Sequence, residues 1–258
     1  MSTYFDALET RSRDEREAAQ LEGLNAQLAR HGLDALETLA DLKSLPVLRK
    51  ADLVARQKEA PPFGGLPVSN LLHACGIGVG DVVQNCFGYH LTPAGMIFEN
   101  GARAVGAAVL PAGTGQTELQ VRAAKDVGVT AYAGTPDYLK VILEKADEMG
   151  LELQIARAAV GGGALFPSLR AWYEERGILC LQCYATADLG NVAYESSAKE
   201  GMILDEGVIL EIVTPGTGDP VAEGEVGEIV VTTLNPDYPL IRFATGDLSA
   251  ILPGESPC

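Results

Sequence analysis

Apolar and polar positions in the middle of this chain repeat with two different periods. Between Asp81 and Gly190, short apolar runs alternate with longer stretches in which apolar residues recur at helical spacing. Proline stands at the start of several expected helices, and glycine stands near their ends. The runs that predict strands are 82–86, 107–110, 129–132, 155–160 and 178–183. We therefore predict an α/β fold with a parallel sheet flanked by helices, whose binding crevice lies at the carboxyl ends of the strands.

The two ends of the chain have other patterns. Ser12 and Glu15 have the spacing of a capping box, and the leucines after them recur at helical spacing until Gly32. Beyond Gly190, β-type runs are separated by glycine- and proline-rich turns, which indicates a smaller β-rich subdomain. The expected regions are a helical N-terminal region (1–66), a central α/β subdomain (67–190) and a β-rich subdomain (191–258).

Composition narrows the class of function. The 258 residues are 47% apolar, and the net charge is −16. After residue 60 the chain has 24 acidic residues and 10 basic ones, a balance that argues against nucleic acid or an anionic membrane as a partner. No apolar run approaches the roughly 18 residues that a membrane helix requires. A small-molecule ligand is the better expectation.

The five cysteines favour a reducing compartment. They are scattered and odd in number, so we expect no disulfide framework and a cytoplasmic location. Cys180 and Cys183 have CxxC spacing, but residues three apart in a strand point to opposite faces of the sheet. Neither a zinc site nor dithiol chemistry is therefore favoured. The sequence leaves the oligomeric state open, a homodimer included.

Three segments carry residues that suit a nucleotide. The glycine-rich turn 161–164 lies between an apolar strand and a helix, where its backbone N–H groups would lie close to a flat or anionic ligand. Tyr184 offers an aromatic face, and Asp188 and Asp247 offer two carboxylates in separate turns. An aromatic face and two acids suit a purine nucleoside and its metal-bound phosphates. Each segment also has a plainer interpretation, as a strand-to-helix turn, a core tyrosine or a surface aspartate.

The segments 184–190 and 239–247 resemble the nucleotide-binding signatures of the adenylate-forming superfamily, and in detail those of its phenylacetate-CoA ligase branch. The first is similar to the pattern YG-x-[ST]-E, with Ala185, Ala187 and Asp188 in place of the glycine, the hydroxyl residue and the glutamate. The second is similar to PLIRYRTGD at most positions. The resemblance implies a truncated form of the large domain of an adenylate-forming enzyme.

The same resemblance implies a role for each residue. Tyr184 would stack on adenine along the turn 161–164, and Asp247 would accept hydrogen bonds from both ribose hydroxyls. Asp188 would hold the Mg²⁺ of ATP. Arg242 would orient its loop or contact phosphate, and a structural salt bridge is an equal alternative for it. The implied nucleotide-binding residues are Gly161, Gly162, Gly163, Ala164, Tyr184, Ala185, Thr186, Arg242 and Asp247. The acid substrate would lie at two strand-to-helix junctions that contain Phe87, Tyr89, His90, Tyr132 and Gly134.

The implied reaction is that of an ATP-dependent acid–CoA ligase. An acid, for instance an aryl acid such as phenylacetate, would be activated as acyl-AMP and transferred to CoA, so ATP or AMP, Mg²⁺ and CoA are the expected cofactors. Two family elements are not found: the phosphate loop expected before 67–74 and the C-terminal lid domain with its lysine. Their absence keeps open a non-catalytic module that binds a nucleotide or an acyl-adenylate. A nicotinamide oxidoreductase is disfavoured, since Glu118 stands where a dinucleotide motif needs its third glycine.

Overall fold

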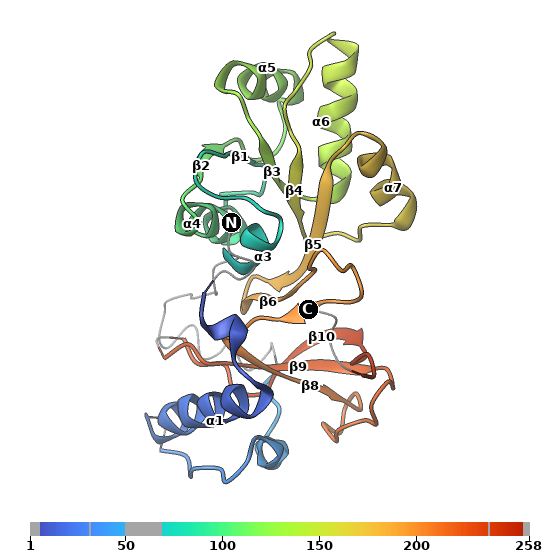
Figure 1. Cartoon of the computed structure of the whole chain (residues 1–258). Coiled ribbons are helices and arrows are strands. Elements are labelled where there is room, and N and C mark those ends of the chain that lie inside the picture. Colours follow the sequence, from blue (N-terminus) through green and yellow to red (C-terminus); the bar gives the residue numbers. More distant parts are fainter. Residues whose placement is uncertain (1–5, 31, 50–68, 237, 255–258) are drawn as a thin grey trace. The chain divides into compact units, whose positions relative to one another are not determined.

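The computed structural model describes residues 6–30, 32–49, 69–236 and 238–254. The chain divides into two compact units, drawn in Figure 1. The first, called the α/β unit, lies within residues 65–205. The second, called the β-rich unit, combines residues 6–64 with 206–256. The N-terminal helical region therefore shares a unit with the β-rich region that follows it much later in the sequence.

A seven-stranded sheet forms the centre of the α/β unit, in the order β2-β1-β3-β4-β5-β6-β7. Strands β1 to β5 are parallel, and β6 and β7 extend the sheet in antiparallel pairing. The bounds are β1 Val82–Asn85, β2 Ala108–Pro111, β3 Ala131–Gly134, β4 Arg157–Val160, β5 Leu179–Thr186, β6 Gly190–Tyr194 and β7 Ile203–Leu204. All five strands expected from the apolar runs are present, so the predicted fold class is confirmed.

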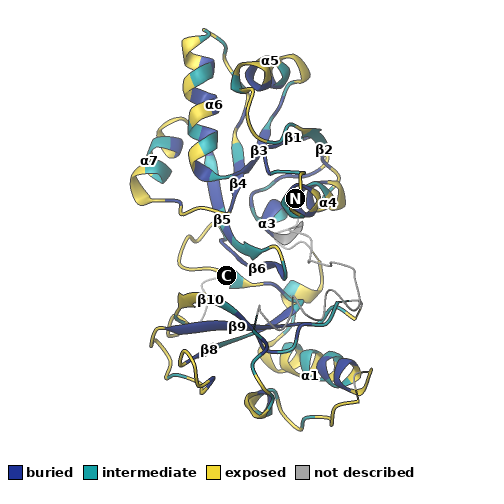
Figure 2. Cartoon of the chain, turned by 180° about the vertical axis from the view of Figure 1, so that it is seen from behind, coloured by how far each residue is buried: buried dark blue, intermediate teal, exposed yellow. Residues whose placement is uncertain are grey.

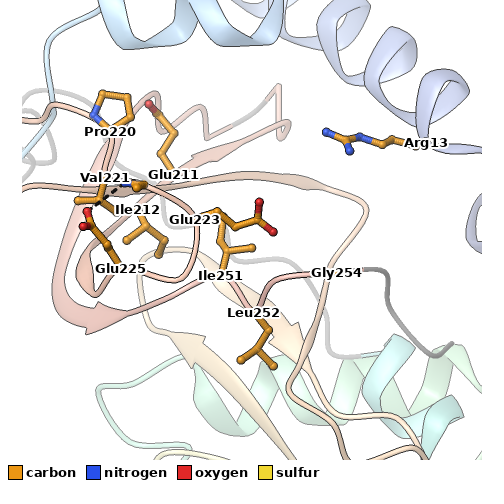
Figure 3. A pocket seen from close by; sticks show the side chains of 11 residues that line it. Arg13, Glu211, Ile212, Pro220, Val221, Glu223, Glu225, Ile251, Leu252 and Gly254 are labelled. Carbon is orange, nitrogen blue, oxygen red and sulfur yellow. Dashed lines mark hydrogen bonds between the residues drawn. The ribbon is translucent and has the colours of Figure 1, made fainter.

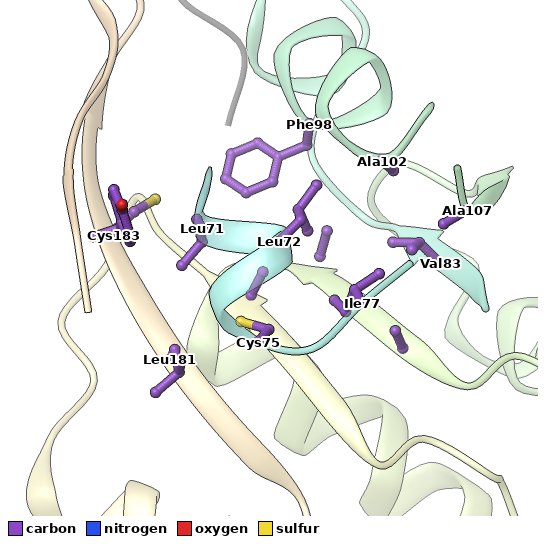
Figure 4. Packing of buried hydrophobic residues seen from close by; sticks show 14 of the residues in the cluster. Leu71, Leu72, Cys75, Ile77, Val83, Phe98, Ala102, Ala107, Leu181 and Cys183 are labelled. Carbon is purple, nitrogen blue, oxygen red and sulfur yellow. The ribbon is translucent and has the colours of Figure 1, made fainter. Parts of the chain in front are cut away.

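Helices cover both faces of this sheet. Their bounds are α3 Ser69–Ala74, α4 Ala94–Ala104, α5 Thr117–Val127, α6 Pro136–Glu148 and α7 Pro167–Glu175. Ala131 and Ala133 of β3 join the core cluster of α3 and α4, whereas Tyr132 between them joins that of α5, α6 and α7. Figure 4 shows the first cluster, with Leu72 of α3 and Phe98 of α4 among the packed side chains. Strands buried on both faces are apolar throughout, which explains the continuous runs in the sequence.

The β-rich unit has a three-stranded antiparallel sheet in the order β10-β9-β8. Its elements are η1 Leu8–Thr10, α1 Arg13–Arg30, η2 Leu39–Ser44, β8 Val208–Val213, β9 Gly227–Thr233 and β10 Phe243–Ser249. The predicted capping box is confirmed, since the Ser12 N–H donates to Glu15 at 2.8 Å and the Glu15 N–H donates to Ser12 Oγ at 3.3 Å. Leu24 and Leu28 of α1 are fully buried in a cluster with Ile209 of β8.

Two further contacts join the N-terminal segment to this sheet. Gln27 of α1 donates from Nε2 to the Thr233 carbonyl oxygen at 2.9 Å, and Leu48 forms an isolated parallel bridge with Phe243. Buried strands and exposed outer helix faces are coloured in Figure 2. Within the described ranges, no helix is both long enough and apolar enough to cross a membrane. The expected phosphate-loop position before 67–74 falls largely outside the described residues.

Candidate active site

The carboxyl ends of four parallel strands lie along one edge of the α/β unit, in the order β1-β3-β4-β5. Three predicted segments leave the sheet at this edge and contact one another. The Gly161 N–H donates to the Gly134 carbonyl oxygen at 3.2 Å. A methyl group placed on Gly162 would lie 3.8 Å from the Phe87 ring. The structure thus brings the predicted adenine turn next to the predicted acid pocket.

The glycine turn needs a residue without a side chain at its first position. A Cβ atom on Gly161 would lie 2.9 Å from Cys183 Sγ, which is too close for a carbon atom without some displacement. Gly162 has φ +69°, a conformation that favours glycine. Gly162, Gly163 and Ala164 are exposed, so this turn presents backbone groups to solvent. A flat ligand would have access to that backbone.

Tyr184 lies where β5 extends past its parallel neighbours into an antiparallel hairpin with β6. Cys183 and Ala185 pack in the core cluster of α3 and α4, and Tyr184 between them is half-buried. The β5–β6 register shifts between Tyr184 and Ala185. At the hairpin turn, the Leu189 N–H donates to Thr186 Oγ at 3.1 Å, and this turn carries the half-buried Asp188.

Asn85 holds the loop of the predicted acid pocket in place. Its Nδ2 donates to the Tyr89 hydroxyl and to the Gly95 carbonyl oxygen, both at 2.8 Å. Its Oδ1 accepts a hydrogen bond from the Phe87 N–H at 3.2 Å. The Tyr89 hydroxyl in turn donates to Glu99 at 3.0 Å, and burial together with this carboxylate raises the pKa of Tyr89. The phenol is therefore neutral, and its proton is already shared with Glu99.

The other predicted acid-pocket residues have different surroundings. Phe87 stacks on Phe98 with ring centroids 4.0 Å apart, and both rings belong to the core cluster of α3 and α4. His90 is exposed in the loop between β1 and α4. Tyr132 is fully buried on the α5–α7 side of the sheet. Its hydroxyl donates to the Thr135 carbonyl oxygen at 3.0 Å, and a side chain at Gly134 would overlap this hydroxyl. The Tyr132 ring therefore belongs to the core, and we leave it out of the acid pocket.

Asp247 lies in an interruption of β10. The pairing with β9 shifts register between Ala244 and Leu248, so the intervening residues leave the regular ladder. Asp247 is exposed there, and its N–H donates to Thr245 Oγ at 3.1 Å. Gly246 has φ +85°, as this turn requires. The carboxylate is thus presented to solvent on a short, well-defined turn.

Arg242 is buried and its guanidinium bonds mainly within the protein. Its side chain is only 3% exposed, and Nε donates to Glu211 at 2.9 Å. Nη1 donates to the carbonyl oxygens of Lys43 and Leu45, and Nη2 donates to that of Gly218 at 2.9 Å. Four of the five guanidinium N–H groups are therefore used within the β-rich unit. The sequence also allowed a structural salt bridge for Arg242, and this geometry contains one, with Glu211.

A surface pocket of about 540 Å³ lies elsewhere in the β-rich unit. Figure 3 shows its lining, where Ile212, Ile251 and Leu252 are mixed with the carboxylates of Glu223 and Glu225. None of the predicted site residues lines it. Its volume alone does not make it a nucleotide site, and the predicted residues lie on strand ends and turns instead.

The cysteine geometry agrees with the sequence analysis. Cys180 packs in the α5–α7 cluster and Cys183 in the α3–α4 cluster, so the prediction that they point to opposite faces is confirmed. Burial raises the pKa of both thiols to about 12, which keeps them protonated near neutral pH. In the described ranges no group of three or more metal-ligating side chains is found.

Sequence reasoning missed two buried polar residues at this edge, Asn85 and Glu195. Their exposed fractions are 1% and 5%. The available signal is a polar residue at the end of an apolar run, because a buried amide or carboxylate must find partners inside the protein. Their partners are distant in sequence or lie in a loop.

Comparison with known proteins defines the class to which this chain belongs. The family model described as AMP-binding enzyme matches residues 68–235. The chain also matches crystal structures of 2-hydroxyisobutyryl-CoA ligase. For the complex with 2-HIB-AMP and CoA, the TM-score is 0.85 at 22% identity, and the match covers 100% of this chain and 68% of the ligase. At that identity the likeness concerns the fold. The chain belongs to the AMP-binding enzymes.

Curated relatives then identify the branch. The phenylacetate-coenzyme A ligase of Aromatoleum evansii is 30% identical over 305 positions, which cover 96% of this chain and 69% of the relative. That of Escherichia coli K12 is 28% identical, and the match covers 99% of this chain and 71% of the relative. The phenylacetate-CoA ligase family is thus the one that includes this chain, as its motifs indicated.

These alignments also locate a difference in length. In the match to the Aromatoleum protein, 96% of this chain is about 248 residues, so about 57 of the 305 aligned positions have no counterpart here. The match to the Thermus thermophilus phenylacetate-coenzyme A ligase covers 70% of this chain over 191 positions, which leaves only about 10 such positions. Most of the difference therefore lies outside the part of the chain that this shorter match covers.

Proposed function

We propose that this chain is the nucleotide- and acid-binding part of an ATP-dependent acid–CoA ligase. A carboxylate oxygen attacks the α-phosphorus of ATP, pyrophosphate leaves, and an acyl-adenylate forms. The CoA thiol then attacks the acyl carbon, and AMP leaves. One observation carries the proposal: the Phe87 loop meets the glycine turn at the carboxyl edge of the sheet, in a chain that belongs to the AMP-binding enzymes. Open α/β sheets bind their ligands at this edge.

The nucleotide contacts follow from the chemistry of three positions. The exposed backbone of 162–164 suits the edge of adenine, and stacking on Tyr184 would contribute about 1–3 kcal/mol, as aromatic stacking on a base does elsewhere. The two carboxylate oxygens of Asp247 match the two adjacent hydroxyl donors of ribose. Asp188 has the hard oxygen atoms that Mg²⁺ prefers, and the ion would neutralise the phosphate charge when bound with ATP.

The walls of the acid pocket favour an aryl acid. Phe87 and Phe98 stack, Tyr89 follows Phe87 in the same loop, and the Tyr89 hydroxyl is already bonded to Glu99. An aromatic wall with few open polar groups suits an apolar or aromatic acyl chain. The named relatives are phenylacetate-coenzyme A ligases, so we propose an acid of the phenylacetate class. A cytoplasmic location fits the free, buried thiols.

Two measurements on the 258-residue chain test this function. The first is ATP–pyrophosphate exchange with phenylacetate, benzoate, hexanoate and 2-hydroxyisobutyrate added separately. The second is the melting temperature with AMP or NAD. We expect exchange that depends on an aryl acid and stabilisation by AMP alone, because a ligand that binds the folded state raises its stability.

The outcomes separate the alternatives. Stabilisation by AMP without exchange for any acid would indicate a binding module and would contradict the ligase activity of this chain. Stabilisation by NAD in place of AMP would indicate a nicotinamide enzyme. Exchange with hexanoate but not with the aryl acids would retain the ligase and reject the substrate class.

A further inference from the structure

A buried ion pair lies beside the glycine turn and involves none of the predicted site residues. Arg170 of α7 donates from Nη2 to both carboxylate oxygens of Glu195, at 2.7 and 2.8 Å. The two side chains are 16% and 6% exposed. Buried ion pairs often add little net stability compared with apolar residues, because both charges lose their hydration. The positions of the neighbouring side chains that such a pair fixes are therefore more informative about its role than its contribution to stability.

Glu195 also fixes a third side chain. It accepts hydrogen bonds from the Gln182 N–H at 3.0 Å and from Gln182 Nε2 at 2.9 Å. An ionised carboxylate is only an acceptor, so it determines which end of the Gln182 amide carries the nitrogen. The amide oxygen then faces the Leu165 N–H at 3.4 Å. Gln182 thus connects the ion pair with the end of the glycine turn.

This connection holds a segment whose own backbone is permissive. Three consecutive glycines begin the turn, and glycine loses more conformational freedom on folding than other residues. The Gly161 N–H is fixed to the Gly134 carbonyl oxygen at the start of the turn, and the Leu165 N–H is held by Gln182 at the end. Arg170 adds a second tie, because Nη1 donates to the Cys180 carbonyl oxygen at 2.9 Å and joins the first turns of α7 to β5.

We propose that Glu195, with Arg170 and Gln182, is a positioning residue that holds the turn 161–165 in the conformation that binds adenine. The proposal rests on the function proposed above, since it assigns the turn to the nucleotide. Glu195 itself does not touch the ligand in this account. It acts through Gln182 and α7.

The control is another ion pair of the same unit, with a buried carboxylate and a half-exposed arginine, Arg157 (35% exposed). Asp81 is 9% exposed and accepts a hydrogen bond from Arg157 Nη1 at 2.7 Å, and both residues lie at the amino ends of their strands. Glu195→Gln and Asp81→Asn each leave an arginine without its carboxylate partner. Gln182→Met keeps the length of the side chain and removes only its amide, so it tests the connection where Glu195→Gln folds poorly.

Two quantities are compared: the dissociation constant for AMP by calorimetry, and the rate of amide hydrogen exchange in peptides that span 161–165 without nucleotide. We expect Glu195→Gln and Gln182→Met to raise both by about tenfold, in keeping with the loss of one hydrogen bond to a charged group. Asp81→Asn is expected to lower the melting temperature and leave both quantities unchanged. Conditions are set so that every variant is fully folded.

Three results would count against this scheme, and each has a different meaning. Unchanged exchange and AMP affinity in both site variants would overturn the positioning role and leave the ligase function intact. Equal losses in Asp81→Asn would show general destabilisation and would also overturn it. A parent chain that does not bind AMP would overturn the proposed function. Faster hydrogen exchange of the turn in Glu195→Gln would then still show that Glu195 holds the turn, because exchange is measured without nucleotide.

Discussion

Removal of the Arg242 guanidinium should be among the most destabilising single changes in the β-rich unit. The side chain is 3% exposed, and it connects β10 with β8 through Glu211 and with the N-terminal segment through the Lys43 and Leu45 carbonyl oxygens. Arg242→Met keeps most of the apolar length but removes every one of these hydrogen bonds. Glu211 would remain as a carboxylate without its cationic partner.

The magnitude follows from burial of the two partners. Loss of one member of a buried ion pair costs about 3–5 kcal/mol, because the remaining charge is left without a partner. Glu211 is 16% exposed and borders the pocket of Figure 3, so water reaches it in part and the lower end of this range applies. Even about 3 kcal/mol is a large share of the 5–15 kcal/mol that stabilises a typical domain.

The assay must report on the β-rich unit. The single tryptophan, Trp172, lies in α7 of the α/β unit, so its fluorescence reports on the other part of the chain. Urea unfolding followed by circular dichroism, with hydrogen exchange of β8 to β10, measures the relevant loss. Arg13→Met is the matched control, since its pair with Glu17 is 87% and 48% exposed and such exposed ion pairs contribute little to stability.

A loss below about 1 kcal/mol for Arg242→Met would refute this account of the β-rich unit. A second comparison isolates the charge: the double variant with Glu211→Leu should recover part of the lost stability, because it removes the carboxylate that was left unpaired. No recovery would mean that the carbonyl contacts, and not the ion pair, carry the effect.

Three further predictions concern the candidate site and the buried thiols. Asp247→Ala should raise the calorimetric dissociation constant for AMP by about tenfold or more and barely change the melting temperature, since the residue is exposed; unchanged affinity would remove its assignment to ribose. Gly161→Ala should cost about 1–3 kcal/mol in urea unfolding because the added methyl lies 2.9 Å from Cys183 Sγ, and Cys183→Ala should relieve most of this cost; no relief would refute the steric cause. Burial raises the pKa of Cys180 and Cys183 from 9.0 to about 12, so their contribution to stability is complete below pH 9 and is lost as the pH rises toward 12. A pH series of unfolding curves should show this decline, and thiols that react freely at pH 8 in the folded chain would contradict it.

Local patterns predicted the α/β unit because its elements depend on short stretches of sequence. The apolar runs, the helix-starting Pro136 and Pro167 and the capping box of Ser12 each determine structure within a few residues. Long-range contacts have no such signal. The bridge between Leu48 and Phe243, which joins the N-terminal segment to the last strand, is an example. The association of residues 6–64 with 206–256 was accordingly not foreseen.

The candidate site shows the same limit. Motifs identified Tyr184 and Asp247, and the structure provides their local geometry, but the roles of these residues remain predictions. Tyr132 is buried on the α5–α7 face because successive residues of β3 point to opposite faces of the sheet. A shift of one residue in the register of β3 would have placed the ring on the α3–α4 face. The role proposed for Glu195 rests on its partners on α7 and β5.

Both strands that carry the main predicted nucleotide residues are irregular at those residues. The β5–β6 ladder shifts register next to Tyr184, and the β9–β10 ladder shifts around Asp247. A regular ladder uses its backbone groups in pairing and spaces its side chains evenly, whereas a bulge redirects a side chain and releases backbone groups. Bulges are common beside active sites for this reason. Both motif residues therefore lie at β-bulges. This supports a ligand-binding role for both segments, because a strand with only a structural role would gain stability from regular pairing.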